Sequence, residues 1–337
     1  MPGWFDLIRS AAANRWQHLR GGTPAPEAER YHAISHNPSV PLPRGAQRDL
    51  AADNPRLVEL RKRYAALDWP VCRHTFWAPE AVERDVRLPW FRGDNAYVWQ
   101  YRQLGHDTVG KAAIVARHVE SRDELRLLER LREDGLFGAW TFADDRHGRI
   151  SRDLLDSVNE INFLERHLHL SRQPNLRVAD IGAGYGRLAH RLCAALPNVA
   201  QYDCLDAVPE STFLCEYYLK FRGIERARSI PLDEVATVLP GSRYHLALNI
   251  HSFSECTLDG IRWWLQRLAG DRVPHLLIVP NHWDELNSAE LDGTTRDFGP
   301  ALLEAGYRLV HKEPVYDAAV GAATGVRDHF MLYELRP

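Results

Sequence analysis

From Arg177 onward, short runs of apolar residues alternate with longer segments whose apolar residues recur at helical spacing. Such runs are typical of strands buried in a parallel sheet, and their alternation with helices is typical of a sheet covered on both faces. We expect helices between the strands, including one over Glu210–Phe221. The predicted strands are Leu176–Ile181, Gln201–Asp206, Ala227–Pro231, Tyr244–Ile250 and Leu276–Pro280.

The last part of the chain has a different pattern. Tyr307–His311 and His329–Leu335 predict two further strands, and the residues between them show no helical period. Strands joined without a crossover helix pair antiparallel. We therefore expect an α/β fold with a Rossmann-like seven-stranded sheet whose last hairpin is antiparallel, preceded by a mainly helical N-terminal domain.

In the first half of the chain, apolar stripes at helical spacing predict helices over Asn54–Leu67, Ser121–Asp134 and Ser151–Leu170. Ser121 and Glu124 have the spacing of a capping box at the start of the second helix. This capping box is the reason to begin that helix at Ser121.

The predicted organisation has three parts. A polar loop at Ala143–Arg149 separates a helical domain, residues 51–150, from the α/β domain, residues 151–337. Residues 1–50 contain a short amphipathic piece, Trp4–Leu19, followed by a stretch rich in glycine and proline. This composition is typical of an extended arm.

Composition excludes several classes of protein. The 42 Lys and Arg residues are scattered and balanced by 45 Asp and Glu residues, so there is no basic footprint for a nucleic acid. The five cysteines form no C-x-x-C pair, which favours reduced thiols in a cytosol. Neither a signal peptide nor an apolar run long enough for a membrane span is present. We expect a cytoplasmic protein without membrane partners, and a homo-oligomer is left open.

One segment, RVADIGAGYGRLAHRL at Arg177–Leu192, combines a strand, a glycine-rich turn and the start of a helix. Glycine allows backbone conformations that a Cβ obstructs and lets a ligand approach the main chain. A dinucleotide turn has the spacing G-x-G-x-x-G, but here the last of those positions is Arg187 and the third glycine comes one residue earlier. The turn therefore differs from a dinucleotide site. Its glycines are Gly182, Gly184 and Gly186.

The G-x-G-x-G spacing after an acidic strand end resembles motif I of class I S-adenosylmethionine-dependent methyltransferases, whose sheet also ends in an antiparallel hairpin. This resemblance implies S-adenosyl-L-methionine as the cofactor and S-adenosyl-L-homocysteine as the product. We expect the three glycines and Asn249, near the end of the fourth strand, to contact the cofactor.

Three carboxylates are candidate cofactor ligands. Asp206 lies about 20 residues past the glycines, where a carboxylate accepts hydrogen bonds from ribose hydroxyls, and its alternative role is a helix N-cap. Asp180 is expected to hold the glycine turn or the cofactor's amino group. Asp233 is expected to reach the adenine amino group. For Asp180 and Asp233, the alternative is a simple turn carboxylate.

Ligands of open parallel sheets bind outside the carboxyl ends of the strands. NIHSFSEC, at Asn249–Cys256, follows the fourth strand there. Methyl transfer to an alcohol requires a positioned nucleophile and a base for its proton. His251 is the first candidate base, Glu255 is expected to orient it or to bind an acceptor hydroxyl, and Ser252 is expected to contact the acceptor. The alternative for His251 is a hydrogen bond to a loop carbonyl.

A second candidate loop, PNHWDE at Pro280–Glu285, follows the fifth strand. His282 is the second candidate base, and its alternative is an exposed loop residue. Glu255, His282 and Asp284 carry atoms that bind divalent metals, but no compact ligand spacing stands out, so we expect no metal.

Aromatic and polar residues are interleaved in WFRGDNAYVWQYR at Trp90–Arg102. Flat apolar faces with fixed polar groups between them are suited to a sugar or polyphenol. The alternative is a helix that packs its aromatic residues on its neighbours. The candidate acceptor-binding residues are Arg92, Asp94, Asn95, Tyr97 and Gln100.

Four stretches together resemble a bacterial family of sugar O-methyltransferases, over roughly Asn54 to the C-terminus. The matching stretches are FRGDNAYVWQYR (91–102), SVNEINFLERHL (157–168), DIGAGYGRLA (180–189) and NIHSFSEC (249–256). The resemblance implies a catalytic domain at 151–337, an acceptor-binding or lid domain at 51–150 and S-adenosylmethionine as methyl donor. It also assigns the three turn glycines to the cofactor, and His251 and Glu255 to the active site. Cys256 stands where other members often have methionine.

The expected function is transfer of a methyl group to a hydroxyl of a sugar, glycoside or sugar-containing secondary metabolite. Two alternatives stay open, because a fold does not fix its substrate. One is methylation of a phenolic or lipid hydroxyl or of a nitrogen. The other is a non-catalytic protein that binds S-adenosylmethionine.

Overall fold

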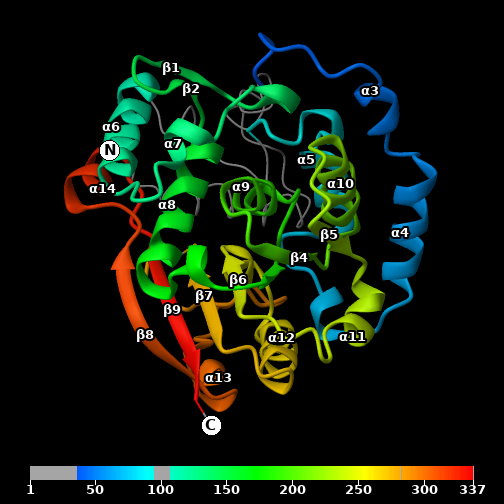
Figure 1. Ribbon diagram of the computed structural model, residues 1–337. Helices are drawn as coiled ribbons and strands as arrows, with labels where there is room; N and C mark the ends of the chain where they lie inside the picture. Colours follow the sequence, from blue (N-terminus) through cyan, green and yellow to red (C-terminus); the bar gives the residue numbers. More distant parts are fainter. Residues whose placement is uncertain (1–35, 95–106, 282, 337) are drawn as a thin grey trace.

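The computed structural model describes residues 36–94, 107–281 and 283–336 (Figure 1). The predictions for the first 35 residues, and for the candidate site residues Asn95, Tyr97, Gln100 and His282, lie outside the described residues.

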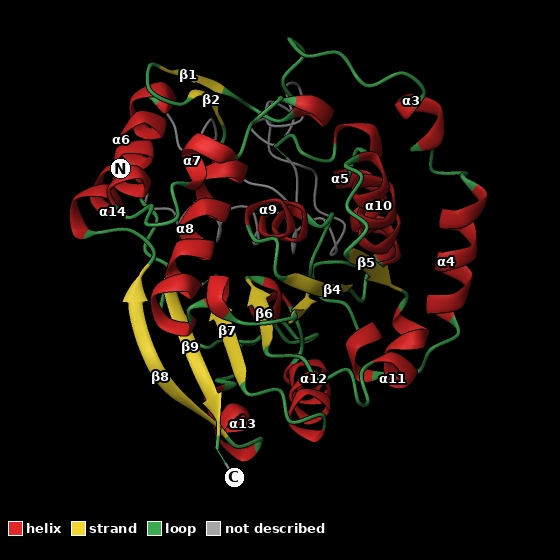
Figure 2. Ribbon diagram, viewed as in Figure 1, coloured by secondary structure: helices red, strands yellow, loops and turns green. Residues whose placement is uncertain are grey.

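A sheet with the strand order β5-β4-β3-β6-β7-β9-β8 forms the centre of the described molecule (Figure 2). All neighbouring strands run parallel except β9, which is antiparallel to both β7 and β8. The predicted seven-stranded Rossmann-like sheet with an antiparallel last hairpin is confirmed. The strands are β3 (Leu176–Ile181), β4 (Val199–Leu205), β5 (Ala227–Ile230), β6 (Leu246–Ile250), β7 (His275–Val279), β8 (Tyr307–Pro314) and β9 (His329–Leu335).

The order of the strands reverses direction at β3, because β4 lies on one side of it and β6 on the other. In open α/β sheets such a switch point leaves a crevice at the carboxyl ends of the strands, where ligands bind. The glycine turn follows β3 and the NIHSFSEC loop follows β6. The fold therefore brings the two most informative sequence motifs to the same edge of the sheet.

Helices surround the sheet and also precede it in the chain (Figure 2). They are α3 (Ala46–Asp49), α4 (Pro55–Ala65), α5 (Pro79–Asp85), α6 (Thr108–Ser121), α7 (Leu127–Arg130), α8 (Arg152–Leu168), α9 (Arg187–Ala195), α10 (Pro209–Phe221), α11 (Val235–Val238), α12 (Leu258–Gly270), α13 (Gly299–Glu304) and α14 (Ala318–Thr324).

Two predicted helices begin at the caps that their sequences provide. The Asn54 side chain accepts a hydrogen bond from the backbone nitrogen of Arg56 (2.9 Å) at the start of α4. The Ser151 hydroxyl accepts one from the backbone nitrogen of Leu154 (3.0 Å) at the start of α8. In both cases the cap satisfies a backbone donor that the first helical turn leaves unpaired.

The helix predicted over Ser121–Asp134 is wrong. Ser121 is the last residue of α6, and its hydroxyl donates to the His118 carbonyl oxygen (2.7 Å) instead of capping a new helix. Arg126 has a left-handed backbone (φ 54°), and only the short α7 follows it. The sequence has the spacing of a capping box, but Ser121 ends one helix instead of starting another.

Two connections also differ from the prediction. The polar loop at Ala143–Arg149 is instead part of a hairpin of β1 (Phe142–Asp144) and β2 (Gly148–Ile150), with the Asp144 side chain accepting from two turn nitrogens. Between β8 and β9, where no helix was predicted, α14 is capped by Asp317. This helix is short and consists mostly of residues with small side chains, so its sequence shows no apolar stripe.

The core consists of two clusters of buried residues, one on each face of the sheet. Successive residues of a strand belong to different clusters. Along β3, Ala179 and Ile181 belong to one cluster, while Leu176 and Val178 belong to the other. This is the period of two that places successive side chains on opposite faces of a sheet. The first cluster includes residues of α4, and the second includes residues of α6, so segments before position 150 complete both clusters.

Candidate functional site

The three turn glycines all have left-handed backbones, with φ of 74° at Gly182, 56° at Gly184 and 83° at Gly186. A Cβ at Gly182 would lie 2.1 Å from the Ser252 hydroxyl oxygen, and one at Gly186 would lie 2.9 Å from the Cys215 sulfur. Among the described residues, a Cβ at Gly184 would meet nothing within 4 Å. Close packing therefore requires glycine at the outer two positions, whereas Gly184 borders open space.

Asp206 binds the middle of the glycine turn. Its Oδ2 accepts a hydrogen bond from the backbone nitrogen of Gly184 (3.0 Å), and its Oδ1 accepts one from Val208 (2.9 Å). Burial raises the pKa of Asp206 from its ordinary value of 3.8 to about 7. The residue does not cap α10, because Val208 occupies the cap position. Asp206 therefore lies beside the open space at Gly184.

The other two candidate acids have protein partners. Asp180 is buried and accepts a hydrogen bond from the Tyr202 hydroxyl (2.8 Å), and burial raises its pKa to about 6. Asp233 accepts two hydrogen bonds from the guanidinium of Arg63 in α4, at 2.8 and 2.7 Å. Asp180 thus lies beneath the turn, and Asp233 joins α4 to the loop after β5.

Asn249 connects the ends of two strands. Its amide nitrogen donates to the Ile181 carbonyl oxygen (3.0 Å) and to the Ser252 hydroxyl (2.6 Å), and its side-chain oxygen accepts from the nitrogen of Phe253 (3.0 Å). The residue has no exposed surface. Asn249 therefore holds the loop after β6 against the glycine turn, and Ser252 packs on Gly182 as part of the same contact.

A tyrosine of the glycine turn reaches a buried group of charges. The Tyr185 hydroxyl donates to Asp153 of α8, and Asp153 also accepts from Arg92 at 2.9 Å. Arg92 donates to Glu133 at 2.8 Å, and Glu133 accepts from Arg191 of α9 at the same distance. Burial raises the pKa of Asp153, but the charges of Arg92 and Arg191 outweigh it and hold that pKa well below its usual range.

This arrangement places Arg92, a predicted acceptor-binding residue, among protein partners. The Arg92 side chain has no exposed area and is enclosed in the buried ion network. Because its side chain is buried and paired, Arg92 connects the N-terminal half to the glycine turn and does not offer an exposed surface to a sugar. Asp94, the other described residue of this set, is also buried.

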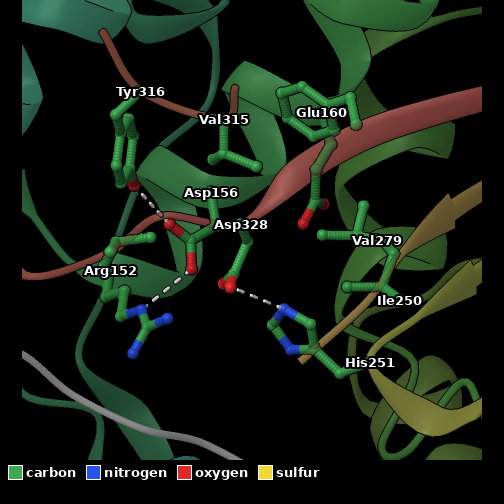
Figure 3. A pocket seen from close by; sticks show the side chains of 11 residues that line it. Arg152, Asp156, Glu160, Ile250, His251, Val279, Val315, Tyr316 and Asp328 are labelled. Atoms are coloured by element: carbon green, nitrogen blue, oxygen red, sulfur yellow. Dashed lines mark hydrogen bonds and ion pairs between the residues drawn. The ribbon is translucent and has the colours of Figure 1, made fainter. Parts of the chain in front are cut away.

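His251 stands in a hollow at the carboxyl ends of β6 and β7 (Figure 3). Its backbone is left-handed (φ 69°), a conformation that is uncommon for a residue with a side chain and that clusters at functional sites. Its backbone nitrogen donates to the Val279 carbonyl oxygen (2.7 Å). The ring is about one third exposed, and its Nε2 lies 3.6 Å from Oδ2 of Asp328.

Helix α8 forms the opposite wall of the hollow (Figure 3). Asp156 accepts a hydrogen bond from Arg152 at 3.0 Å and one from the Tyr316 hydroxyl at 2.9 Å. One turn further along the helix, Glu160 accepts two hydrogen bonds from Arg187, both at 2.8 Å, while burial raises the Glu160 pKa. Arg187 directly follows the glycine turn, so α8 connects the hollow with the turn.

Glu255 is held by other residues than His251. Its two carboxylate oxygens accept from Nε1 of Trp77 (2.8 Å) and from the side-chain nitrogen of Asn281 (3.0 Å). The Thr75 hydroxyl donates to the Glu255 backbone oxygen at 2.8 Å. In the described residues the His251 ring forms an ion-pair contact with Asp328 and interacts electrostatically with Glu160, so Glu255 is not the acid beside the ring; its other predicted role, binding an acceptor hydroxyl, stays a prediction.

The segment that contacts Glu255 also reaches the part of the crevice beside Asp206. His74 hydrogen-bonds with the backbone of Ala207, directly after Asp206, and burial lowers its pKa to about 4, so its ring is neutral. The Tyr64 hydroxyl accepts from the backbone nitrogen of Leu232 (2.8 Å). Residues from the N-terminal half therefore border the crevice from Ala207 to Glu255.

Sequence reasoning did not find the residues that complete the hollow. Tyr316 and Asp328 lie in the connection between β8 and β9, which showed no pattern of its own. Glu160 had a signal, because it lies within the stretch SVNEINFLERHL that the family resemblance includes. Asp284, one of the three residues whose atoms could bind a metal, pairs with Lys312 at 2.7 Å.

Across residues 36–94, 107–281 and 283–336, no group of three or more His, Cys, Asp and Glu side chains is arranged to hold a metal ion. No helix in the same ranges combines the length and apolar character of a membrane span.

Comparisons with known proteins give structural similarity alone. No protein-family model matches the chain, and no curated protein matches it. A SAM-dependent methyltransferase from Aquifex aeolicus is 16% identical, with a TM-score of 0.40, over 53% of this chain and 89% of its own. Magnesium protoporphyrin IX methyltransferase (ChlM) from Synechocystis PCC 6803 with bound SAM is 12% identical, with a TM-score of 0.40, over 67% and 97%.

The StiE O-MT structure is 17% identical, with a TM-score of 0.39, over 52% of this chain and 73% of its own. These values are low, so the fold assignment rests on the strand order and the turn described above.

Proposed function

We propose that this protein is an S-adenosylmethionine-dependent methyltransferase. The observation that carries the proposal is the pairing of Asp206 with the backbone of Gly184, beside open space at the switch point of the sheet. A carboxylate there accepts hydrogen bonds from ribose hydroxyls, and a residue without a side chain lets the ligand approach the turn.

The residues of the turn fit S-adenosylmethionine better than a dinucleotide. At the position where a dinucleotide turn has its third glycine, this chain has Arg187, whose guanidinium is bound by Glu160. That cation is therefore engaged within the protein instead of being offered to a pyrophosphate. Asp206 would hold the ribose, and the backbone of the turn would contact the methionine part of the cofactor.

When bound, S-adenosylmethionine supplies a methyl carbon activated by a positively charged sulfur. The protein then has to position an acceptor and remove its proton. His251 lies at the carboxyl end of β6, next to the strand that carries the glycine turn, and its ring is partly exposed to the hollow. We assign His251 as the base that takes the proton from an acceptor hydroxyl.

We further propose that the acceptor is a sugar or glycoside. The acids that line the hollow among the described residues are Asp156, Glu160 and Asp328; the first two are paired with Arg152 and Arg187, which leaves one net negative charge. Carboxylates accept hydrogen bonds from hydroxyl groups and repel anions, so this lining favours a neutral polyol over a phosphate or carboxylate. The resemblance of NIHSFSEC and FRGDNAYVWQYR to sugar O-methyltransferases points to the same class.

The helical region before position 150 acts in this proposal as a cover for the site. Thr75 and Trp77 bind Glu255, and Arg63 binds Asp233. These contacts cross the same edge of the sheet on which both ligands are expected. The region thereby limits access of water to the reacting groups.

The test is transfer of a labelled methyl group from S-adenosylmethionine to a panel of methyl glycosides, with catechol and simple amines for comparison. We expect product with a glycoside, and replacement of the base in His251→Gln to lower kcat by about 100-fold or more. His311→Gln, at an exposed position in β8, is the control. Full activity of His251→Gln would exclude the base role, and transfer to catechol or an amine alone would exclude the sugar.

A further inference from the structure

We propose that Asp328 is a positioning residue for His251, holding the ring so that Nε2 carries the proton and Nδ1 accepts the proton of the acceptor hydroxyl. The inference rests on the proposed function and adds a residue that no sequence motif indicated. It begins from the distance of 3.6 Å between Nε2 of His251 and Oδ2 of Asp328.

The orientation of the ring supports this assignment (Figure 3). The nitrogen joined to Asp328 by the dashed line is Nε2, and the other ring nitrogen points away from the carboxylate. A carboxylate beside one nitrogen of a neutral imidazole favours the tautomer with the proton on that nitrogen. The second nitrogen then keeps its lone pair, which a general base requires. A separation of 3.6 Å suits a pair that shortens when the ligands bind.

Asp328 differs from the other acids of the hollow in its partners. Asp156 has Arg152 and Tyr316, whereas Glu160 is hydrogen-bonded by Arg187 and also interacts electrostatically with His251. The Asp328 side chain is about nine-tenths buried, and in the described residues the His251 ring is the group that its carboxylate faces. Burying a carboxylate without a hydrogen bond or an opposite charge costs free energy. The contact with His251 therefore explains how the Asp328 carboxylate can be buried.

The backbone fixes Asp328 from both sides. Its carbonyl oxygen accepts from the nitrogen of Val315 (2.8 Å), and the next residue, His329, donates its nitrogen to the Trp283 carbonyl oxygen (3.0 Å). From His329 onward the chain is in β9, which pairs with β7. The backbone that carries the Asp328 side chain is therefore hydrogen-bonded on both sides, as a positioning residue requires.

The pair gives a balanced proton path. The acceptor oxygen forms a bond to the methyl carbon while the carbon–sulfur bond breaks and leaves its electron pair on sulfur. The hydroxyl proton moves to Nδ1 of His251, and the resulting imidazolium is stabilised by the negative charge of Asp328. Because the ring is partly exposed, the proton then passes to solvent. The products are a methyl ether and S-adenosylhomocysteine.

The test is Asp328→Asn, which keeps the size of the side chain but removes its charge. The amide can donate to Nε2, which moves the ring proton to Nδ1 and blocks the base. Nitrogen NMR of histidine-labelled full-length protein with S-adenosylhomocysteine reads the tautomer directly, and His251→Gln identifies the signal. We expect the proton on Nε2 in the wild type and on Nδ1 in Asp328→Asn, with kcat for the glycoside lowered about 100-fold and KM little changed.

Two further variants separate positioning from folding. Asp317→Asn is the matched control, because Asp317 lies in the same connection and also pairs with a histidine, His118 (3.0 Å), but does not line the hollow. We expect it to keep full activity. Asp328→Glu restores the carboxylate and should recover part of the kcat lost in Asp328→Asn.

The outcomes distinguish the two proposals. An inactive His251→Gln together with a fully active Asp328→Asn, or a ring proton on Nδ1 in the wild type, overturns the role of Asp328 and leaves the methyltransferase standing. A wild-type chain that binds S-adenosylmethionine but methylates nothing in the panel overturns the proposed reaction itself, whatever tautomer the ring has.

Discussion

The acidic residues of the crevice differ in their hydrogen-bonding partners. Asp206 is buried and receives two backbone hydrogen bonds, yet its pKa is raised to about 7 because burial disfavours its charge. Asp233 has a comparable place after the next strand but is paired with Arg63. The acid that is ready to accept hydrogen bonds from a ligand is therefore Asp206.

Binding of S-adenosylmethionine should release a proton near neutral pH. Ribose hydroxyls and the cationic sulfur favour the charged form of Asp206, so binding lowers its pKa from about 7. Affinity should then rise by up to about tenfold from about pH 6 to about pH 8. Calorimetry in buffers of different ionisation enthalpy measures the release, and an affinity that does not change with pH would contradict this role.

Asp206 should have the opposite effect on stability: affinity for S-adenosylmethionine rises with pH, whereas the contribution of Asp206 to the free energy of unfolding falls. The folded protein keeps the Asp206 proton up to about pH 7, whereas the unfolded chain releases it near 3.8. The unfolded state therefore binds fewer protons in that window, and the contribution of this residue to the free energy of unfolding falls as the pH rises.

At the scale of elements, the sequence predicted the sheet well because buried strands repeat with a short apolar pattern bounded by polar residues. The strand Leu176–Ile181 has the predicted bounds. The helix predicted over Ser121–Asp134 was wrong because other hydrogen bonds replace the predicted capping box. The Asn162 side chain of α8 accepts from the backbone nitrogen of Leu125, and the Asp123 side chain accepts from that of Leu128. The contact with α8 exists only after the chain has folded.

The same limit applies to the candidate site. NIHSFSEC and the glycine turn were found because each is contiguous and lies at a strand end. Asp328 was not found because its position depends on the antiparallel return of β9 beside β7. The spacing between Asp328 and His251 in the sequence carries no information about that contact.

The glycine turn allows a matched test at this scale. Gly184 and Gly148 both have left-handed backbones, and a Cβ added at either would meet no atom of the described residues within 4 Å, but Gly148 lies in the hairpin of β1 and β2. Gly184→Val and Gly148→Val should each cost about 1–2 kcal/mol of stability from backbone strain. Only Gly184→Val should lose affinity for S-adenosylmethionine, by more than about tenfold, as measured by calorimetry.

Equal affinities in the two valine variants would show that the space beside Gly184 is not where the cofactor binds.

At the scale of the whole molecule, the N-terminal half and the sheet are joined by charge as well as by apolar packing. Arg92 and Glu133 come before position 150, while Asp153 and Arg191 belong to the helices beside the sheet. Tyr185 connects this network to the glycine turn. Through Arg92 and Glu133, the N-terminal half thereby contributes to the shape of the turn.

Arg92→Leu should lower the free energy of unfolding by about 3–5 kcal/mol, because it leaves Glu133 and Asp153 with less of the opposite charge that compensates their burial. Arg84→Gln, which removes an exposed ion pair with Asp85, should cost less than about 1 kcal/mol. Denaturant unfolding measures both. If Arg92→Leu is as stable as the wild type but has a raised KM for the acceptor, Arg92 binds substrate after all.

The central claim, that this crevice binds S-adenosylmethionine, is tested most directly by calorimetry of the full-length wild-type protein with S-adenosylmethionine and with NAD. The account predicts saturable binding of S-adenosylmethionine, weakened by more than about tenfold in Asp206→Ala through loss of the ribose hydrogen bonds, and no comparable binding of NAD. Tight binding of NAD without binding of S-adenosylmethionine would contradict it.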